Sequence, residues 1–154
     1  PRFVFAPSDA RGAFESMIRA FDLTQKYRVP AIVITDQYLA DSYWTMDQPD
    51  LRSIRAKDYF ESGSSAQAGI FKTYELTENG ISPRYRPGTP GVLVKADSDE
   101  HDEYGHITED AETRKKMAGK RWKKHEAMKS ETGVVLPQGL TSAEIRARLS
   151  LGQV

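Results

Sequence analysis

The segment ADSDEHDEYGHITED, which spans residues 96–110, concentrates carboxylate and imidazole side chains in a run with almost no helix or strand pattern. Such groups act as general acids and bases, and they bind zinc or iron. The candidate functional residues in this acidic loop are Asp99, Glu100, His101, Asp102, Glu103 and His106. Their spacing matches neither H-E-x-x-H nor a zinc-finger pattern, so we predict no metal site. A surface turn held by its own hydrogen bonds explains the same composition, and both interpretations stay open.

Several well-known functional motifs do not occur in the sequence. It contains no G-x-x-x-x-G-K-[ST], G-x-G-x-x-G or G-x-S-x-G, so it gives no support to a phosphate-binding loop or a nucleophile elbow. It also has no Cys, which excludes disulfides, thiolate metal sites and ligation of an iron–sulfur cluster by these residues. The lack of Cys is compatible with a reducing cytoplasm, which is the predicted location.

Charge is balanced over the chain but not along it. The 154 residues include 22 basic and 22 acidic side chains, so no overall field attracts nucleic acid or an anionic membrane. No apolar run approaches the roughly 18 residues of a membrane span. Eight acids between Asp97 and Glu112 precede seven bases between Arg114 and Lys124. We therefore expect pairing within the chain or a solvated helix face, and regard nucleic-acid binding as unlikely.

The first third of the chain predicts a β-α-β unit. Residues 2–6 and 31–35 are apolar runs, and the second, AIVIT, is typical of a strand covered on both faces of a parallel sheet. Between them, Pro7-Ser8-Asp9 supplies a turn and a helix N-cap. Phe14, Met17, Ile18 and Phe21 then recur at helical spacing, so residues 9–26 should form a helix between two parallel strands.

Shorter elements are expected after this unit. Residues 51–60 are a possible helix, 61–69 a small-residue mobile loop, and 91–96 a strand leading into the acidic loop. Asn79-Gly80 between two extended runs indicates a β-hairpin, although Pro83 and Pro87 argue against a central strand.

A long helix should follow the acidic loop. Thr108-Glu109-Asp110 provides its N-cap, and a thin contact stripe is predicted at Ala111, Ala118, Trp122 and His125. A short capped helix is expected near 141–149. We divide the chain into 1–107, an α/β part; 108–131, the basic helix; and 132–154, a C-terminal extension.

Separated segments resemble the alpha subunit of 2-oxoacid:ferredoxin oxidoreductases, particularly the 2-oxoglutarate type. The similar segments are PSDARGAFESMIRAFDLTQKYRVPAIVITDQYL, ISPRYRPG, DSDEHDEYGHITED and TRKKMAGKRWKKHE. They occur in the family's order and cover about residues 1–131. The resemblance implies an α/β fold: part of a thiamine-diphosphate-binding, pyrimidine-type, doubly wound parallel sheet with a β-hairpin insertion and a long C-terminal helix.

The same resemblance implies an activity and partners. The alpha chain works with a beta subunit that supplies the pyrophosphate-binding domain and an iron–sulfur cluster. Together they decarboxylate a 2-oxoacid such as 2-oxoglutarate, form the acyl thioester of coenzyme A and reduce ferredoxin. The acidic loop would lie near the subunit interface or the substrate entrance, because ligand-facing residues follow the carboxyl ends of strands in doubly wound sheets.

The sequence also departs from the family pattern. The family's Tyr-Pro-Ile-Thr-Pro motif, its acidic residue facing the aminopyrimidine and its Gly-Pro-Ser-Thr-Gly segment are absent. We therefore expect thiamine diphosphate and magnesium in the whole enzyme, no cofactor on this chain alone, and no activity of this chain alone. Family members usually continue after the basic helix into a second α/β domain, and the resemblance therefore implies that residues 1–107 are the C-terminal half of a pyrimidine-type α/β domain, followed by an extension. The alternative is a non-catalytic α/β interaction module that docks a protein or a nucleic acid.

Overall fold

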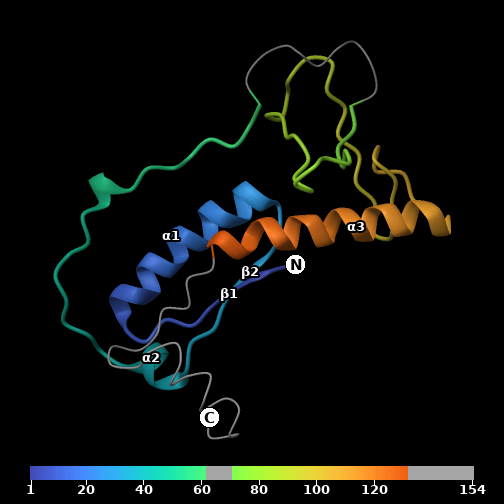
Figure 1. The fold of residues 1–154 in the computed structure, drawn as a ribbon. Coiled ribbons are helices and arrows are strands. Elements are labelled where there is room, and N and C mark those ends of the chain that lie inside the picture. Colours follow the sequence, from blue (N-terminus) through green and yellow to red (C-terminus); the bar gives the residue numbers. More distant parts are fainter. Residues whose placement is uncertain (62–70, 132–154) are drawn as a thin grey trace, which may run out of the picture.

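The computed structural model describes residues 1–61 and 71–131. Three expectations fall outside these residues: the small-residue loop except for Glu61, the C-terminal extension, and the short helix near 141–149. Within the described residues the element order is β1, α1, β2, α2, a 3₁₀ turn, α3 and a second 3₁₀ turn (Figure 1).

The β-α-β unit is confirmed. Strand β1, Phe3–Phe5, pairs in parallel with β2, Ala31–Val33, and Phe3 lies opposite Ala31. Helix α1, Ala10–Tyr27, connects them. The pairing extends beyond the strands, because the Phe3 amide donates to Pro30 at 3.0 Å and the Ile34 amide donates to Phe5 at 2.8 Å. The strands are shorter than predicted, but their direction and the helix between them are as expected.

Local chemistry fixes both ends of α1. The Asp9 carboxylate accepts from the Gly12 amide at 2.7 Å, which is the predicted N-cap. At the other end Arg28 takes a left-handed conformation, with φ of 52°, and its amide donates to Thr24. The chain therefore leaves the helix sharply and enters β2 three residues later, at Ala31.

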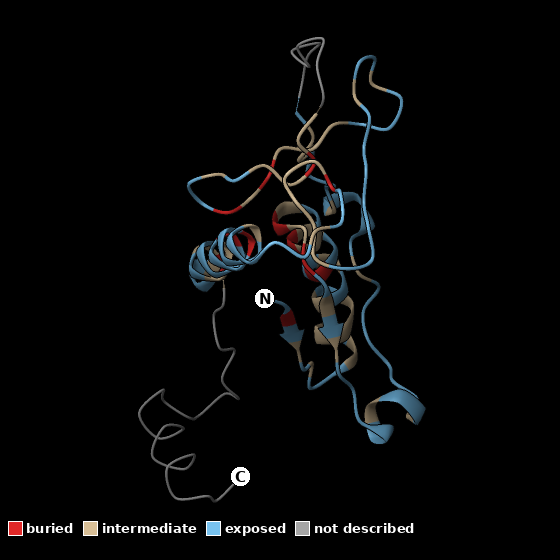
Figure 2. Cartoon of the chain, turned by 90° about the vertical axis from the view of Figure 1, so that its right-hand side faces the viewer, coloured by how far each residue is buried: buried red, intermediate tan, exposed pale blue. Residues whose placement is uncertain are grey.

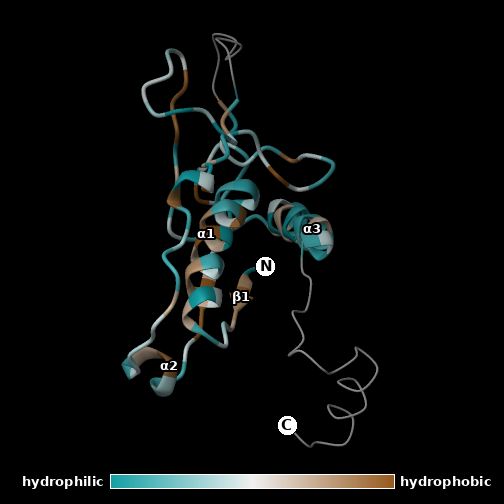
Figure 3. Ribbon diagram, turned by 90° about the vertical axis from the view of Figure 1, so that its left-hand side faces the viewer, coloured by the Kyte–Doolittle hydropathy of each residue, from teal (hydrophilic) through white to brown (hydrophobic). Residues whose placement is uncertain are grey.

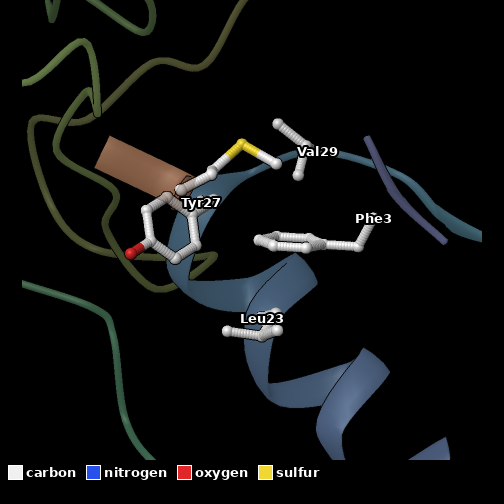
Figure 4. Packing of buried hydrophobic residues seen from close by; sticks show 5 residues of the cluster. Phe3, Leu23, Tyr27 and Val29 are labelled. Atoms are coloured by element: carbon white, nitrogen blue, oxygen red, sulfur yellow. The ribbon is translucent and has the colours of Figure 1, made fainter. Parts of the chain in front are cut away.

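The core joins the two ends of the described chain. Phe3, Leu23, Tyr27 and Val29 of the β-α-β unit pack with Met128 of the C-terminal helix (Figure 4). The rings of Phe3 and Tyr27 meet edge to face, with centroids 5.6 Å apart. Each such side chain contributes about 1.5–3 kcal/mol by leaving water. Figure 2 shows the buried residues gathered where α1, α3 and the loops meet.

The expectation of a strand covered on both faces is wrong for the described residues. Helix α1 packs on one face of the sheet, whereas Val4, Ile32 and Ile34 on the other face are exposed. The apolar helix stripe is also only partly used, since Phe21 is 66% exposed. The free face of the sheet and the exposed part of the α1 stripe are both apolar, as is typical of a parallel sheet with more strands than the two described here.

The possible helix at 51–60 does not form beyond one 3₁₀ turn, Leu51–Ser53. Before it, a short helix α2, Gln37–Asp41, begins with Asp36 as its N-cap. Residues 42–60 then run along the molecule as an extended arm, which Figure 1 shows in teal and green. Isolated helical turns are unstable without a surface to pack on, and Leu51 is exposed.

The predicted hairpin and the strand at 91–96 are also wrong. The chain reverses at Thr77 to Gly80, but no strands pair on either side. Side chains satisfy the backbone instead: the Ser82 hydroxyl donates to the Glu75 carbonyl, and the Thr77 hydroxyl to the Ile81 carbonyl. Residues 91–96 have no neighbouring strand among those described, so their extended preference produces no ladder.

Helix α3, Ala111–Met128, begins as predicted, because the Asp110 carboxylate accepts from the Thr113 amide at 2.7 Å. Its predicted contact stripe is wrong. The helix buries Met117, Lys120 and Met128, while Trp122 is 65% exposed. Long lysine stems can cover apolar surface while their ends find polar partners, which a stripe based on apolarity misses. Figure 3 accordingly shows α3 as a mainly hydrophilic helix.

Gly80 sets how closely the preceding loop approaches α3. Its φ is +75°, and a Cβ there would lie 2.4 Å from the Lys120 carbonyl oxygen and 2.7 Å from the Lys124 amide nitrogen. Both atoms belong to a helix backbone that cannot rotate away. Only glycine therefore fits this position.

We predict that Gly80→Ala lowers the free energy of unfolding by about 2–4 kcal/mol, because it combines a backbone clash with left-handed strain. Gly119→Ala is the matched control, since nothing lies within 4 Å of a Cβ at that exposed position of α3. It should raise stability by up to about 1 kcal/mol through helix propensity. Urea unfolding measures both, and equal effects would contradict the close approach.

Candidate functional site

Asp102 folds the acidic loop. One oxygen of its carboxylate accepts from the amides of Tyr104 and His106, both at 2.9 Å. Burial opposes ionisation, but these two hydrogen bonds outweigh it and lower the pKa of Asp102. Gly105 completes the turn with φ of +83°, where a Cβ would lie 2.4 Å from the Lys95 carbonyl oxygen. The loop is therefore a defined structure held from within.

Two glutamates tie the acidic loop to the rest of the chain. Glu103 accepts from the Leu76 amide at 2.9 Å and pairs with Lys72 at 3.3 Å. Burial by itself raises the pKa of Glu103, but the hydrogen bonds from Leu76 and Lys72 act in the opposite direction. Their combined effect is larger, so the pKa of Glu103 lies below its ordinary value. Glu100 forms a two-pronged pair with Arg121 of α3, at 3.0 and 2.8 Å, and this hydrogen bonding lowers the pKa of Glu100. Both side chains thus act as attachments.

The remaining predicted residues divide between the inside and the outside of the loop. His101 stacks on Tyr74, with ring centroids 3.8 Å apart and planes 23° apart. His106 is exposed, and its Nε2 lies 2.9 Å from Lys95 Nζ. Asp99 is exposed as well. The structure therefore gathers all six predicted residues in one loop, but it turns only part of them toward solvent.

A second group of side chains surrounds Tyr74. Besides His101, the Tyr74 ring has the Arg28 guanidinium carbon 5.5 Å and Lys120 Nζ 5.6 Å from its centroid. Arg28 also donates to the Thr73 carbonyl at 2.8 Å. Lys120 donates to the Tyr74 carbonyl at 2.8 Å and to the Ser82 hydroxyl. We call Arg28, Tyr74, His101, Lys120 and the neighbouring Lys124 the Tyr74 cluster.

The Tyr74 cluster carries excess positive charge. Burial is the main cause that lowers the pKa of Lys120 to about 8, and repulsion from Lys124 and Arg28 adds to it. Burial likewise lowers the pKa of Lys124 to about 8 and lowers that of Arg28. Among residues 1–61 and 71–131, none of these three forms an ion pair, and Lys124 has no side-chain hydrogen bond. Carbonyl groups and the Tyr74 ring hold Arg28 and Lys120, whereas Lys124 has neither contact among the described residues.

Sequence reasoning missed the Tyr74 cluster. Its members come from the C-cap of α1, the segment after residue 70, the acidic loop and α3, and no spacing rule connects them. Lys120 is one of seven bases in a short run, and nothing in the sequence marks it as the buried one. Gly80 is the only indirect signal, because a turn glycine allows the close approach that buries Lys120.

A groove of about 910 Å³ lies beside this cluster. Its wall carries bases, acids and neutral polar groups: Gln25, Lys26, Arg28, Glu61, Glu75, Thr77, Glu78, Asn79, Ser82 and Arg84, with Tyr59, Ile81 and Pro83. Arg84 lies over the Phe60 ring, 4.2 Å from its centroid, and its buried Nε has no hydrogen-bond partner among the described atoms. The groove is thus polar and of mixed charge.

Comparison with known proteins identifies the family. Residues 1–120 match the family described as pyruvate flavodoxin/ferredoxin oxidoreductase, thiamine diP-bdg, which is its thiamine diphosphate-binding part. The chain belongs to this family. The resemblance inferred from the sequence is thereby confirmed, as is the α/β class.

Named relatives of this oxidoreductase family agree with one another. The chain is 37% identical over 133 residues to 2-oxoacid:ferredoxin oxidoreductase 1, subunit alpha, of Sulfurisphaera tokodaii, covering 85% of this chain and 21% of that protein. It is 39% identical over 129 residues to the corresponding alpha subunit of Saccharolobus solfataricus, covering 80% and 20%. The chain therefore spans about a fifth of the length of these curated relatives.

A solved structure in this family has the same fold. It is a 2-oxoglutarate:ferredoxin oxidoreductase from Magnetococcus marinus with 2-oxoglutarate, coenzyme A and succinyl-CoA bound. The TM-score is 0.76 at 27% identity, over 92% of this chain and 24% of that chain.

The described residues show no site for the metal ion that accompanies the thiamine cofactor named by the family. Its diphosphate needs a cation held by oxygen ligands. No group of three or more His, Cys, Asp or Glu in the described part of the chain is arranged to hold a metal ion. We therefore assign none of these residues to that metal ion. Among the described helices, none is long and apolar enough to cross a membrane.

Removing the charge of Lys120 and removing that of Lys124 should change the free energy of unfolding in opposite directions. Lys120→Met leaves the Tyr74 carbonyl and the Ser82 hydroxyl without their donor, which should cost about 1–3 kcal/mol of unfolding free energy at pH 7. Lys124→Met removes a half-buried ammonium with no such partner, and should stabilise by about 1 kcal/mol.

The pH dependence separates these effects further. A folded pKa near 8, below the ordinary lysine value of 10.5, means that the unfolded chain binds more protons between these two pH values. The free energy of unfolding should therefore rise as the pH is raised from 8 to 10.5. This rise should be smaller in Lys124→Met, because that variant lacks one of the two lysines. Denaturant unfolding of the wild-type protein and of both variants at pH 7 and pH 9.5 measures this rise. Destabilisation by both variants would contradict the assignment of Lys124.

Asp102→Asn should lower the free energy of unfolding by about 1 kcal/mol at pH 7, because the loop loses its charge-assisted hydrogen bonds. The lowered pKa of Asp102 means that this difference is lost as the pH falls through that pKa. Asp99→Asn, at an exposed position of the same loop, is the control and should leave stability unchanged. Thermal melts at pH 7 and pH 3 distinguish the two.

Proposed function

We propose that this chain is part of the alpha subunit of a 2-oxoacid:ferredoxin oxidoreductase. The observation that carries the proposal is the family match over residues 1–120, together with 37–39% identity to alpha subunits of that name. The enzyme would oxidatively decarboxylate a 2-oxoacid, join the acyl group to coenzyme A, release carbon dioxide and pass two electrons to ferredoxin.

The solved relative favours 2-oxoglutarate as the substrate. That protein is a 2-oxoglutarate:ferredoxin oxidoreductase with 2-oxoglutarate, coenzyme A and succinyl-CoA bound. Thiamine diphosphate, when bound with magnesium, supplies the electron sink for decarboxylation. We propose that a beta subunit carries the iron–sulfur cluster and that the assembled enzyme works in the cytoplasm.

We also propose that the acidic loop lies at a subunit interface, or less directly at the substrate entrance. Apolar side chains at Leu93, Val94 and Ile107 are exposed beside it, as in surfaces that meet another chain. Lys95 links the segment that carries Leu93 and Val94 to the acidic loop, since its ammonium lies near His106 and its carbonyl near Gly105. Because no strand leads into the loop, the strand-end argument for a substrate entrance loses its support.

Activity of the complete reading frame tests the proposed function. Co-expressed with its companion subunits, the protein should reduce a viologen dye only when a 2-oxoacid, coenzyme A and thiamine diphosphate are all present. We expect 2-oxoglutarate to give a kcat/KM at least about tenfold above that of pyruvate, since recognition of a second carboxylate is worth 1.4 kcal/mol or more. Dye reduction without coenzyme A would contradict this reaction class.

The same assay distinguishes the two locations of the acidic loop. If His101 and Asp102 face the substrate entrance, His101→Gln and Asp102→Asn should lower kcat/KM about tenfold with little change in melting temperature. If the loop is a pinned turn at an interface, kcat/KM of the assembled enzyme should stay within about twofold while stability falls. The contacts described above favour the second result.

A further inference from the structure

Asn79 is the only asparagine among the 154 residues, and a glycine follows it. In an Asn-Gly pair the backbone nitrogen of the glycine attacks the asparagine side chain readily, because glycine has no side chain to shield that nitrogen. Asn79 is exposed on the wall of the groove, so solvent reaches its amide. A reactive amide thus lies in the turn that approaches α3 most closely, at Gly80.

Hydrogen bonds hold the Asn79 side chain in a bent conformation that favours this attack. The Ile81 amide donates to Asn79 Oδ1 at 3.0 Å, which closes a ring that contains both Asn79 Cγ and the Gly80 nitrogen. The two atoms that would react are thereby kept near each other. The Ile81 donor also faces the oxygen on which negative charge would develop. The Gly80 amide itself has only a long bond, 3.3 Å, to the Thr77 carbonyl.

We propose that Asn79 is a self-modification site, at which the Gly80 backbone nitrogen displaces the side-chain amide and the product detaches the turn from α3. The Gly80 nitrogen loses its proton to solvent and forms a bond to Asn79 Cγ. The bond from Cγ to Nδ2 then breaks, and ammonia leaves. Water opens either carbonyl of the resulting succinimide, which yields aspartate or isoaspartate at position 79. Water is the only reagent consumed.

Isoaspartate is the product that the tertiary structure accommodates poorly. Its main chain runs through Cβ and Cγ, so it carries one extra backbone atom immediately before Gly80. There is little room for a shift at Gly80, because a Cβ there would already lie 2.4 Å from the Lys120 carbonyl oxygen. We expect the turn to withdraw from α3, which weakens the Lys120 bonds to the Tyr74 carbonyl and the Ser82 hydroxyl. Ordinary aspartate keeps the length of the main chain and leaves these bonds in place.

The same turn lines the groove and contacts the core. Thr77, Asn79 and Ser82 belong to the wall of the groove, and Ile81 packs against the hydrophobic core cluster. Withdrawal of the turn would therefore widen the groove and uncover Ile81. The loss of one exposed amide would in this way loosen the attachment between α3 and the segment after residue 70.

The test follows residue 79 in the complete reading frame, co-expressed with its companion subunits. The protein is incubated in mildly alkaline buffer, and mass spectrometry of the tryptic peptide 73–84 measures amide loss and distinguishes aspartate from isoaspartate. Amide loss in the folded protein should be at most about threefold slower than in the same protein unfolded in denaturant. A greater slowing overturns the proposal, because the fold would then protect the amide.

Hydrogen exchange measures detachment of the turn. In the deamidated fraction that contains isoaspartate, the amides of residues 120–124 should exchange about tenfold faster than before incubation. Asn79→Asp is the matched control, since it has the charge of the product without the extra backbone atom, and it should stay within about twofold of the wild-type protein. Asn79→Gln, incubated in parallel, should keep wild-type exchange. Equal exchange in the isoaspartate form and in Asn79→Asp overturns the proposal, as does amide loss that yields no isoaspartate.

Discussion

A buried lysine ammonium holds the described chain together where regular secondary structure is missing. Lys120 of α3 donates to the Tyr74 carbonyl and the Ser82 hydroxyl, and Ser82 in turn donates to the Glu75 carbonyl. The segment after residue 70 forms no ladder, so these bonds replace the pairing that a hairpin would provide. Gly80 makes the contact possible, because any side chain there would strike the backbone of α3.

The acidic loop depends on the same arrangement. Tyr74 stacks on His101, and its amide donates to the Glu103 carbonyl, so the placement of residue 74 by Lys120 also places the loop. Arg121, the next residue on α3, then pairs with Glu100. Helix α3 thus holds the loop through its adjacent residues Lys120 and Arg121, and these contacts involve Glu100, His101 and Glu103 of the candidate residues.

Membership of the oxidoreductase family gives this arrangement a context. The described residues contain no group of three or more His, Cys, Asp or Glu that could hold a metal ion, and they expose the apolar strand residues Val4, Ile32 and Ile34. Exposed apolar surface of this kind is typical of parts that meet other protein surfaces. The hydrogen bonds of Arg28 and Lys120 hold segments of the described chain together.

The sequence by itself determined the β-α-β unit, the start of α3 and the family. Periodicity and capping residues located both parallel strands, α1 and the start of α3, because Asp9 and Asp110 satisfy nearby amides in any fold. Tertiary structure alone decided the hairpin that does not form, the lysines that become buried and the side of α3 that stays exposed. These outcomes depend on contacts between residues about 40 to 100 positions apart, such as Tyr74 with Lys120 and Tyr27 with Ala127. Local preference cannot encode them, because a lysine is buried only where distant carbonyls replace the water that it loses.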